Sequence, residues 1–334
     1  MSKVLFDYSS INKSEWEKLA VHSSVSSWFQ TENAYLFYQS VSDMLTPFVV
    51  AVENNGLRGV AVGYITREKN ALKQLMTQRA IIIGGPLLSD DIEEDELRDL
   101  LHGLRSLLRK KAIYIETRNF HSYTKWKPVF ASCGFVYNEH LNFQVDCSSD
   151  EVIMNNMDRG RKRNIKSSIK EGCVMIEQPT LEQVREFYDI LLDLYRTKVK
   201  LPLFPFDFFE KLYNSPDGHY FLVSYEGKIV GGTACVIHKN KAVYEWFGCG
   251  LDGVIKGVYP STFSTYQGMI YAMNNRIPIL DMMGAGAPKD DYGVRAFKER
   301  FGGKLVEDGR FLCVCRPLSY LIGKIGVKIL KILK

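Results

Sequence analysis

The chain has 334 residues, of which 43 are lysine or arginine, 38 are aspartate or glutamate and 46% are hydrophobic, so its net charge is +5. This composition excludes a disordered, collagen-like or disulfide-stapled chain and predicts about two globular domains. Seven cysteines without a CxxC pair are typical of reduced thiols, so we expect a cytoplasmic protein without a metal site. We find no signal peptide and no apolar run of 18 residues.

The first half of the chain predicts a hairpin followed by further strands and helices. Two strands are expected at about 47–53 and 58–66, on either side of a turn containing Gly56. A short helix is expected to end at Gly134, because glycine commonly follows the last turn of a helix. The elements between hairpin and Gly134 are a strand at 80–84, a helix at about 93–110, a strand at 112–116 and the short helix at 125–132.

The second half repeats this order, with Gly302 in the place of Gly134. Its predicted elements are strands at 220–224, 229–238 and 242–247, a helix at 261–274, a strand at 279–281 and a short helix at 294–301. Each half then closes with two strands, within 135–147 and 305–315. We interpret the pattern as a duplication, and the alternative is two unrelated α/β halves.

Such an order predicts a mixed α/β sheet with a helical layer on each side, built twice. The polar residues 148–150 favour a boundary there, because they suit the start of the next helix. The predicted domains are therefore residues 1–149, residues 150–316, and a separate terminal helix at 317–334.

A basic helix is predicted to open the second half and to end at Gly172. Ile165 and Ile169 form an apolar stripe expected to dock on the sheet, beside a cationic stripe. We predict that the cations bind phosphate or RNA, and the alternative is a solvated helix face. The cationic stripe consists of Arg159, Arg163, Lys166 and Lys170.

The segment 279–303 contains the strongest signal for chemistry. A buried strand ends in Asp281 and is followed by Gly284 and Gly286, which would let the backbone approach a ligand at the carboxyl end of the strand. On the following helix, Lys298 occupies the position that Phe130 holds in the first half. This difference places the chemistry in the second half.

Three sets of motifs resemble the FemABX-like peptidyltransferases. The C-terminal set is the longest, and it comprises Met283 to Gly286, Pro288, Asp291 to Arg295, Phe297, Lys298 and Phe301 to Gly303. The others are Arg161 to Gly172 and Phe29 to Thr31. The resemblance implies two tandem GNAT-like acyltransferase domains and transfer of an amino acid from aminoacyl-tRNA to an amine of a cell-wall or surface-glycan precursor.

Two features depart from that family. The second half has no charged heptad run, which leaves no room for the coiled-coil arm of some members. Members that bind a nucleotide-linked peptide precursor often have an arginine and a tyrosine four residues apart, whereas the segment 203–209 is apolar here. The identity of the acceptor is therefore open.

Aminolysis of an activated ester requires a deprotonated amine and a group that stabilises the oxyanion. We predict that Lys298 performs the second task and that Glu245, on a strand, is the base for the acceptor amine. Phe297 is expected to be a platform for the substrate or the terminal base. The remaining predicted substrate-binding residues are Tyr244, Asp281, Gly284, Tyr292 and Arg295. For Lys298, Phe297 and Asp281 the alternative is a structural role.

Two further functions stay open. One is a GNAT-type N-acyltransferase that uses acyl-CoA or an acyl carrier protein. The segment 253–261 contains glycines, but their spacing does not fit the pyrophosphate loop of acetyl-CoA enzymes. The other is a non-catalytic binding module on the same fold, against which the intact Phe297 and Lys298 argue.

The chain ends in a basic amphipathic helix, predicted over 317–334. Lys324, Lys328 and Lys331 recur at helical spacing against leucine and isoleucine residues. Such a helix can contact a membrane surface, which would make the protein peripheral on the inner face of the cytoplasmic membrane. Alternatively its apolar side docks on the second domain.

Overall fold

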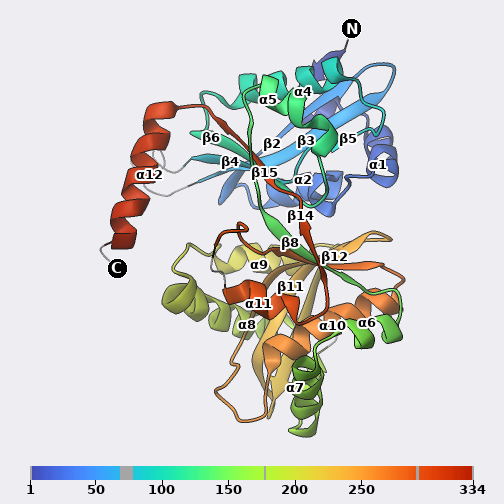
Figure 1. The fold of residues 1–334 in the computed structure, drawn as a ribbon, viewed down its shortest axis with the longest axis vertical. Coiled ribbons are helices and arrows are strands. Elements are labelled where there is room, and N and C mark those ends of the chain that lie inside the picture. The colour runs from blue at the N-terminus through green and yellow to red at the C-terminus, as the bar shows by residue number, and fades with distance from the viewer. Residues whose placement is uncertain (1, 68–77, 177, 291–292, 333–334) are drawn as a thin grey trace. The chain divides into compact units, whose positions relative to one another are not determined.

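The structure is a computed structural model that describes residues 2–67, 78–176, 178–290 and 293–332 (Figure 1). Contacts divide the chain into two units. Unit 1 comprises Met1–Glu139 and Asp308–Lys334, and unit 2 comprises His140–Glu307. These bounds differ from the predicted ones because the closing strands of each half belong to different sheets.

Unit 1 is built on an eight-stranded mixed sheet in the order β1-β2-β3-β4-β6-β15-β7, with β5 paired to β3. Its helices α4 and α5 pack on one face over a continuous hydrophobic core. The strands are β1 (Lys3–Leu5), β2 (Leu45–Glu53), β3 (Leu57–Thr66), β4 (Arg79–Gly84), β5 (Leu87–Leu88), β6 (Tyr114–Asn119), β7 (Val136–Asn138) and β15 (Arg310–Val314). The helices are α1 (Lys13–His22), α2 (Glu32–Ser40), α4 (Glu94–Leu108), α5 (Lys127–Ser132) and α12 (Pro317–Ile332).

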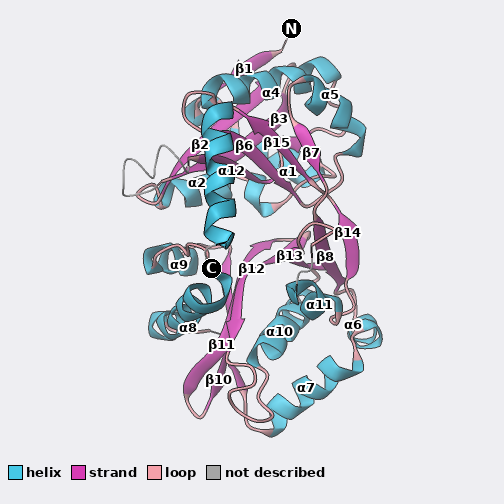
Figure 2. Ribbon diagram, turned by 60° about the vertical axis from the view of Figure 1, so that its left-hand side comes forward, coloured by secondary structure: helices cyan, strands magenta, loops and turns pink. Residues whose placement is uncertain are grey.

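Unit 2 is built on a seven-stranded mixed sheet in the order β14-β8-β13-β12-β11-β10-β9. Helices α6, α7 and α10 lie on one side of this sheet, and α8 and α9 lie on the other (Figure 2). The strands are β8 (Leu141–Asp146), β9 (Val174–Ile176), β10 (Gly218–Tyr225), β11 (Lys228–His238), β12 (Ala242–Gly250), β13 (Ile279–Gly284) and β14 (Lys304–Glu307). The helices are α6 (Asp150–Asn156), α7 (Arg159–Lys170), α8 (Leu181–Leu194), α9 (Phe206–Tyr213), α10 (Pro260–Asn274) and α11 (Gly293–Glu299).

The two closing strands of each half separate between the units. Strand β7 stays in the first sheet, whereas β8 crosses to the second sheet and pairs with β13 and β14. In return, β15 leaves the second half and pairs with β6 and β7. Each sheet is thus completed by a strand from the other half of the sequence.

The duplication is visible in the helices that precede these strands. Helices α5 and α11 are both followed by a glycine with positive φ, namely Gly134 at +82° and Gly302 at +78°. A side chain would be strained in this backbone conformation, so glycine is the residue that can end the helix there. The register predicted from the two glycines therefore holds in the structure.

Helix α12 contacts unit 1 through its first turns. The Tyr320 ring packs edge-on against Tyr114 with centroids 5.6 Å apart, and the Arg316 guanidinium donates to the carbonyl oxygen of Lys110. The predicted alternative, docking on the second domain, is not what the described contacts show. None of the helices within the described ranges combines the length and hydrophobicity that a membrane-spanning segment requires.

Candidate functional site

The candidate site lies where two parallel strands of unit 2 part. Strands β12 and β13 pair over three residues only, and the last pair joins Tyr244 and Asp281. In unit 1 the equivalent strands β4 and β6 stay in register over six residues, up to Gly84 and Asn119. The backbone is therefore opened at the carboxyl ends of the strands in unit 2, where open sheets commonly bind ligands.

We call the point where β12 and β13 separate the fork. Lys298 extends from α11 to the fork. Its ammonium donates to the carbonyl oxygens of Met282, Met283 (3.3 Å) and Gly284 (2.9 Å), all at the end of β13. Burial lowers the pKa of the half-buried amine, and the carboxylates of Glu245 and Asp281 oppose this shift. The side chain predicted to be the catalytic cation is thus held at the opening of the fork.

Glu245 lies on β12, immediately after the last residue that pairs with β13. Its Oε1 accepts a hydrogen bond from the hydroxyl of Thr265, on α10, at 2.9 Å. Its Oε2 is buried and accepts no hydrogen bond from the described part of the chain. Burial raises the pKa of this carboxyl, while the charge of Lys298 and the Thr265 hydroxyl counteract the shift. Oε2 is therefore the carboxylate oxygen that no described donor occupies.

Asp281 is buried, with 1% of its surface exposed, and belongs to a hydrogen-bonded group. The Nδ2 of Asn142 donates to its two oxygens at 2.9 and 3.0 Å, Nε2 of Gln144 at 3.3 Å, and the backbone N–H of Met283 at 2.7 Å. Burial raises the pKa of Asp281 to about 6, against the effect of these donors. The site therefore depends on β8, which sequence reasoning had not connected to Asp281.

The other predicted substrate residues occupy different environments. Tyr244 is buried, with 1% of its surface exposed. The guanidinium of Arg295 donates to the carbonyl oxygens of Ala285 (3.0 Å), Pro288 (3.2 Å) and Ala287, and so fixes the glycine-rich loop. Gly284 presents its carbonyl to Lys298. Tyr292 lies outside the described residues.

Phe297 is covered by an arginine whose role the sequence analysis missed. The Arg161 guanidinium lies 4.2 Å from the centroid of the Phe297 ring and 5.1 Å from that of Phe301. It also donates to the Phe297 carbonyl at 3.2 Å and to the hydroxyl of Thr262, on α10, at 2.9 Å. Arg161 thus ties α7 to both α10 and α11. The motif that begins at Arg161 was the feature of the sequence that could have indicated this role.

The four predicted phosphate-binding cations lie on the exposed side of α7. Helix α7 contains no carboxylate between Arg159 and Lys170. Ile165 is buried as expected, but Ile169 is 55% exposed, so the prediction that it docks on the sheet is wrong. The last turn of α7 is instead buried through Ser168, whose hydroxyl accepts a hydrogen bond from the backbone N–H of Tyr259 at 2.9 Å. Arg159, Arg163, Lys166 and Lys170 are all exposed.

The residue that matches Lys298 in unit 1 has a structural role. Phe130 is fully buried and stacks on Phe311 with centroids 3.9 Å apart. Where unit 2 holds a cation between parting strands, unit 1 fills the same position with core packing. This difference supports the prediction that the chemistry belongs to the second half.

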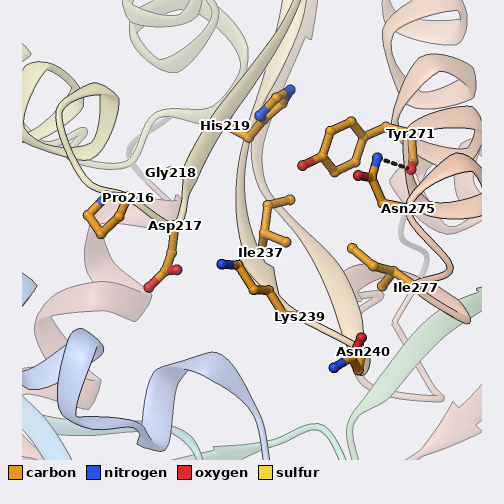
Figure 3. A pocket seen from close by; sticks show the side chains of 10 residues that line it. All are labelled: Pro216, Asp217, Gly218, His219, Ile237, Lys239, Asn240, Tyr271, Asn275 and Ile277. Carbon is orange, nitrogen blue, oxygen red and sulfur yellow. Dashed lines mark hydrogen bonds between the residues drawn. The ribbon is translucent and has the colours of Figure 1, made fainter.

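A separate hollow of about 270 Å³ opens beside the start of β10, the end of β11 and the end of α10 (Figure 3). His219 lies on its wall between the rings of Phe221 and Tyr271, with centroids 4.5 Å away in each case. Burial lowers the pKa of this histidine. The lining contains none of the predicted site residues, and no group of three metal-ligating side chains occurs anywhere in the described ranges.

Comparisons with known proteins identify the architecture. No family model and no curated protein sequence matches the chain. The crystal structure of FemX aligns with a TM-score of 0.74 at 15% identity, over 96% of this chain and 100% of that one. The L-PGS of Bacillus licheniformis aligns with a TM-score of 0.56 at 13% identity, over 94% and 96%. A tandem GNAT protein from the clavulanic acid biosynthesis pathway aligns with a TM-score of 0.61 at 9% identity, over 94% and 99%.

This chain has the tandem GNAT fold. The alignments cover nearly the whole of this chain and of the three solved structures. The fold predicted from the motifs, two GNAT-like domains with mixed sheets, is therefore confirmed.

Proposed function

We propose that this protein is an acyltransferase that forms an amide bond at the fork of unit 2. In the most specific form of the proposal, it transfers an amino acid from aminoacyl-tRNA to an amine of a cell-wall or surface-glycan precursor. The observation that carries the proposal is the pairing of a held ammonium, Lys298, with an unsatisfied carboxylate oxygen, Glu245 Oε2, where the strands part.

Glu245 would accept a proton from the acceptor amine, and the amine nitrogen would attack the carbonyl carbon of the aminoacyl ester. The carbonyl electrons move to oxygen, and the ammonium of Lys298 stabilises that negative charge. Collapse of the intermediate re-forms the carbonyl and breaks the ester bond, and the leaving ribose oxygen takes up the proton that Glu245 had accepted, which returns Glu245 to its carboxylate form. No enzyme nucleophile is needed because the ester is already activated.

The first turn of α10 favours tRNA over a coenzyme A donor. A pyrophosphate bound at a helix start needs free backbone N–H groups. Here Pro260 supplies none, and the Asp252 carboxylate accepts hydrogen bonds from both the hydroxyl and the backbone N–H of Ser261. The cations of α7 offer phosphate contacts of the kind that RNA requires. A donor carried on an acyl carrier protein stays an alternative.

The acceptor is proposed to reach the protein at a membrane surface. Among the proteins that share the fold is the C-terminal domain of a putative lysylphosphatidylglycerol synthetase, at 13% identity and a TM-score of 0.60. Helix α12 is proposed to contribute to membrane contact, because Leu318 and Leu321 are exposed on it and it contains no carboxylate. We therefore place the protein in the cytoplasm, peripheral on the inner face of the membrane.

The test is transfer by wild-type protein and Lys298→Ala, with charged tRNA, acyl-CoA and acyl carrier protein as donors. We expect transfer from charged tRNA, and a 10²- to 10³-fold lower kcat in the variant because one oxyanion-stabilising charge is lost. Lys298→Met, which keeps the aliphatic stem, is the control for packing. It should lose the same activity while its Tm stays near that of the wild type.

Donor binding separates the alternatives. Affinity for charged tRNA that falls steeply with salt supports the tRNA reaction, because each phosphate contact releases counterions. Salt-insensitive binding of coenzyme A alone would support the alternative enzyme, an N-acyltransferase that uses acyl-CoA. If the wild type transfers from no donor and Lys298→Ala binds ligands as the wild type does, only a non-catalytic binding module remains. Equal transfer by the two proteins would instead remove Lys298 from the mechanism.

A further inference from the structure

A short segment of unit 2 presents apolar side chains to solvent between cations. We define the basic loop as residues 195–204, which follow α8 as a π-helical turn (Tyr195–Val199) and lead to α9. Leu201 is 65% exposed and Val199 is 39% exposed. Arg196, Lys198 and Lys200 alternate with them and are exposed, and the basic loop contains no carboxylate.

The backbone of the basic loop contains one residue in a strained conformation. Lys200 has φ at +55°, in the left-handed region, where a side chain is costly and glycine is not. Its N–H donates to the carbonyl oxygen of Tyr195 at 2.7 Å and closes the π-helical turn. Such turns are frequently found at functional sites. The turn fixes the backbone beside Val199 and Leu201, both of which are exposed.

The far end of the basic loop is anchored to α9 and β12 by aromatic contacts. The Phe204 ring stacks on Phe208 with centroids 4.3 Å apart and planes at 8°. Phe208 in turn packs edge-on against Trp246, on β12, at 5.3 Å. Trp246 follows Glu245 in the sequence, but Glu245 bonds to Thr265 of α10 whereas Trp246 packs on α9, and these two helices lie on opposite sides of the sheet (Figure 2). The aromatic stack therefore fixes the end of the basic loop to the α8–α9 side of unit 2.

We propose that the basic loop docks on a bilayer that contains anionic lipid. Lysine and arginine around exposed aliphatic side chains match an interface of negative headgroups over hydrocarbon, because the cations stay among the headgroups while the apolar groups enter. The flanking Asp193 and Asp207 lie outside the basic loop and leave its three cations in excess. This surface goes beyond the proposed function, since it needs neither transfer activity nor α12.

The experiment measures co-sedimentation of the full-length protein with vesicles of phosphatidylcholine alone and with 30% phosphatidylglycerol. Two double variants probe the basic loop. The apolar variant combines Val199→Ser with Leu201→Ser, and the charge variant combines Lys198→Ser with Lys200→Ser. We expect the apolar variant to bind both anionic and neutral vesicles at least tenfold more weakly. The charge variant should lose about fivefold per lysine on anionic vesicles only.

The matched control is Val254→Ser with Lys256→Ser, which removes a 71% exposed valine and an exposed lysine from another loop of the same unit. Its binding should equal that of the wild type. Lys298→Ala should also bind vesicles normally, so failure of the proposed chemistry and failure of this surface give different results. All substituted loop positions are exposed, and circular dichroism would verify folding.

Two results overturn the proposal. Vesicle binding that is unchanged in both variants of the basic loop would assign any membrane contact to other parts of the chain. Loss of binding to uncharged tRNA in the charge variant, with vesicle binding intact, would instead make the basic loop a nucleic-acid surface.

Discussion

At the scale of single residues, the chemistry depends on how burial and neighbours set proton affinities. Glu245 and Lys298 share an environment of low polarity in which each stabilises the charge of the other. Burial acts against both charges, so it raises the pKa of the acid and lowers that of the amine. The raised pKa of Glu245 makes its carboxylate a stronger base than an exposed glutamate, which suits removal of a proton from an amine.

Thr265→Val should shift the pH dependence of transfer. The Thr265 hydroxyl donates to the Glu245 carboxylate and so stabilises its charged form. Without that bond the pKa of Glu245 rises further, and the base is protonated over a wider acidic range. We expect the acidic limb of the kcat profile to move to higher pH. Thr265→Ser should restore the wild-type limb, and an unmoved limb in Thr265→Val would rule Glu245 out as the base.

Asp281 provides a stability test that does not depend on activity. Its pKa is about 6 in the folded protein against 3.8 in the unfolded chain, so the folded state holds the proton more tightly. As pH rises from 4 to 6.5, the wild type should lose about 2 kcal/mol of unfolding free energy from this group.

Asp281→Asn lacks this titration, and its stability should fall less over the same interval. Urea denaturation of both proteins at pH 4 and 6.5 measures the difference. Parallel changes in the two proteins would mean that Asp281 does not titrate with a raised pKa.

At the scale of elements, the site is held by contacts that cross between helices. Helix α11 is only two turns long, and isolated helices of this length are unstable. Arg161 stabilises it by donating to the Phe297 carbonyl near its C-terminal end, where a cation also suits the helix dipole. The face of α11 that carries Lys298 is thereby oriented by a side chain more than a hundred residues earlier.

Helix α12 is the element whose removal tests membrane contact. Deleting residues 317–334 removes every lysine and exposed leucine of the helix but leaves the site residues of unit 2 in place. If α12 contributes to membrane association, the shortened protein should float less with anionic liposomes, while soluble-substrate transfer is retained. Equal flotation of the two proteins would contradict the anchoring role.

At the scale of the whole molecule, the exchange of closing strands decides which fragment is a folding unit. Residues 150–316 correspond to the predicted second domain, yet they lack β8 and include β15, whose partners are β6 and β7. A fragment with these bounds lacks β8, the strand that pairs with both β13 and β14. Unpaired strands bury apolar surface poorly and expose backbone polar groups.

The fragment 140–307 should therefore fold, and the fragment 150–316 should not. The first retains all seven strands of its sheet, including Asn142 and Gln144 beside Asp281. We expect a cooperative thermal transition for 140–307 and none for 150–316, measured by circular dichroism. A cooperative transition in 150–316 would show that β8 is dispensable.

The sequence by itself determined the order of elements, the glycine ends of α5 and α11, and the contrast between Phe130 and Lys298. Those features are local, because periodicity, turn chemistry and register are encoded in neighbouring residues. Only the tertiary structure decided that β8 supplies the partners of Asp281, that Arg161 secures α11, and that Ile169 is exposed. These depend on pairing across long separations, where each strand has several acceptable neighbours and the packing of the whole sheet selects one.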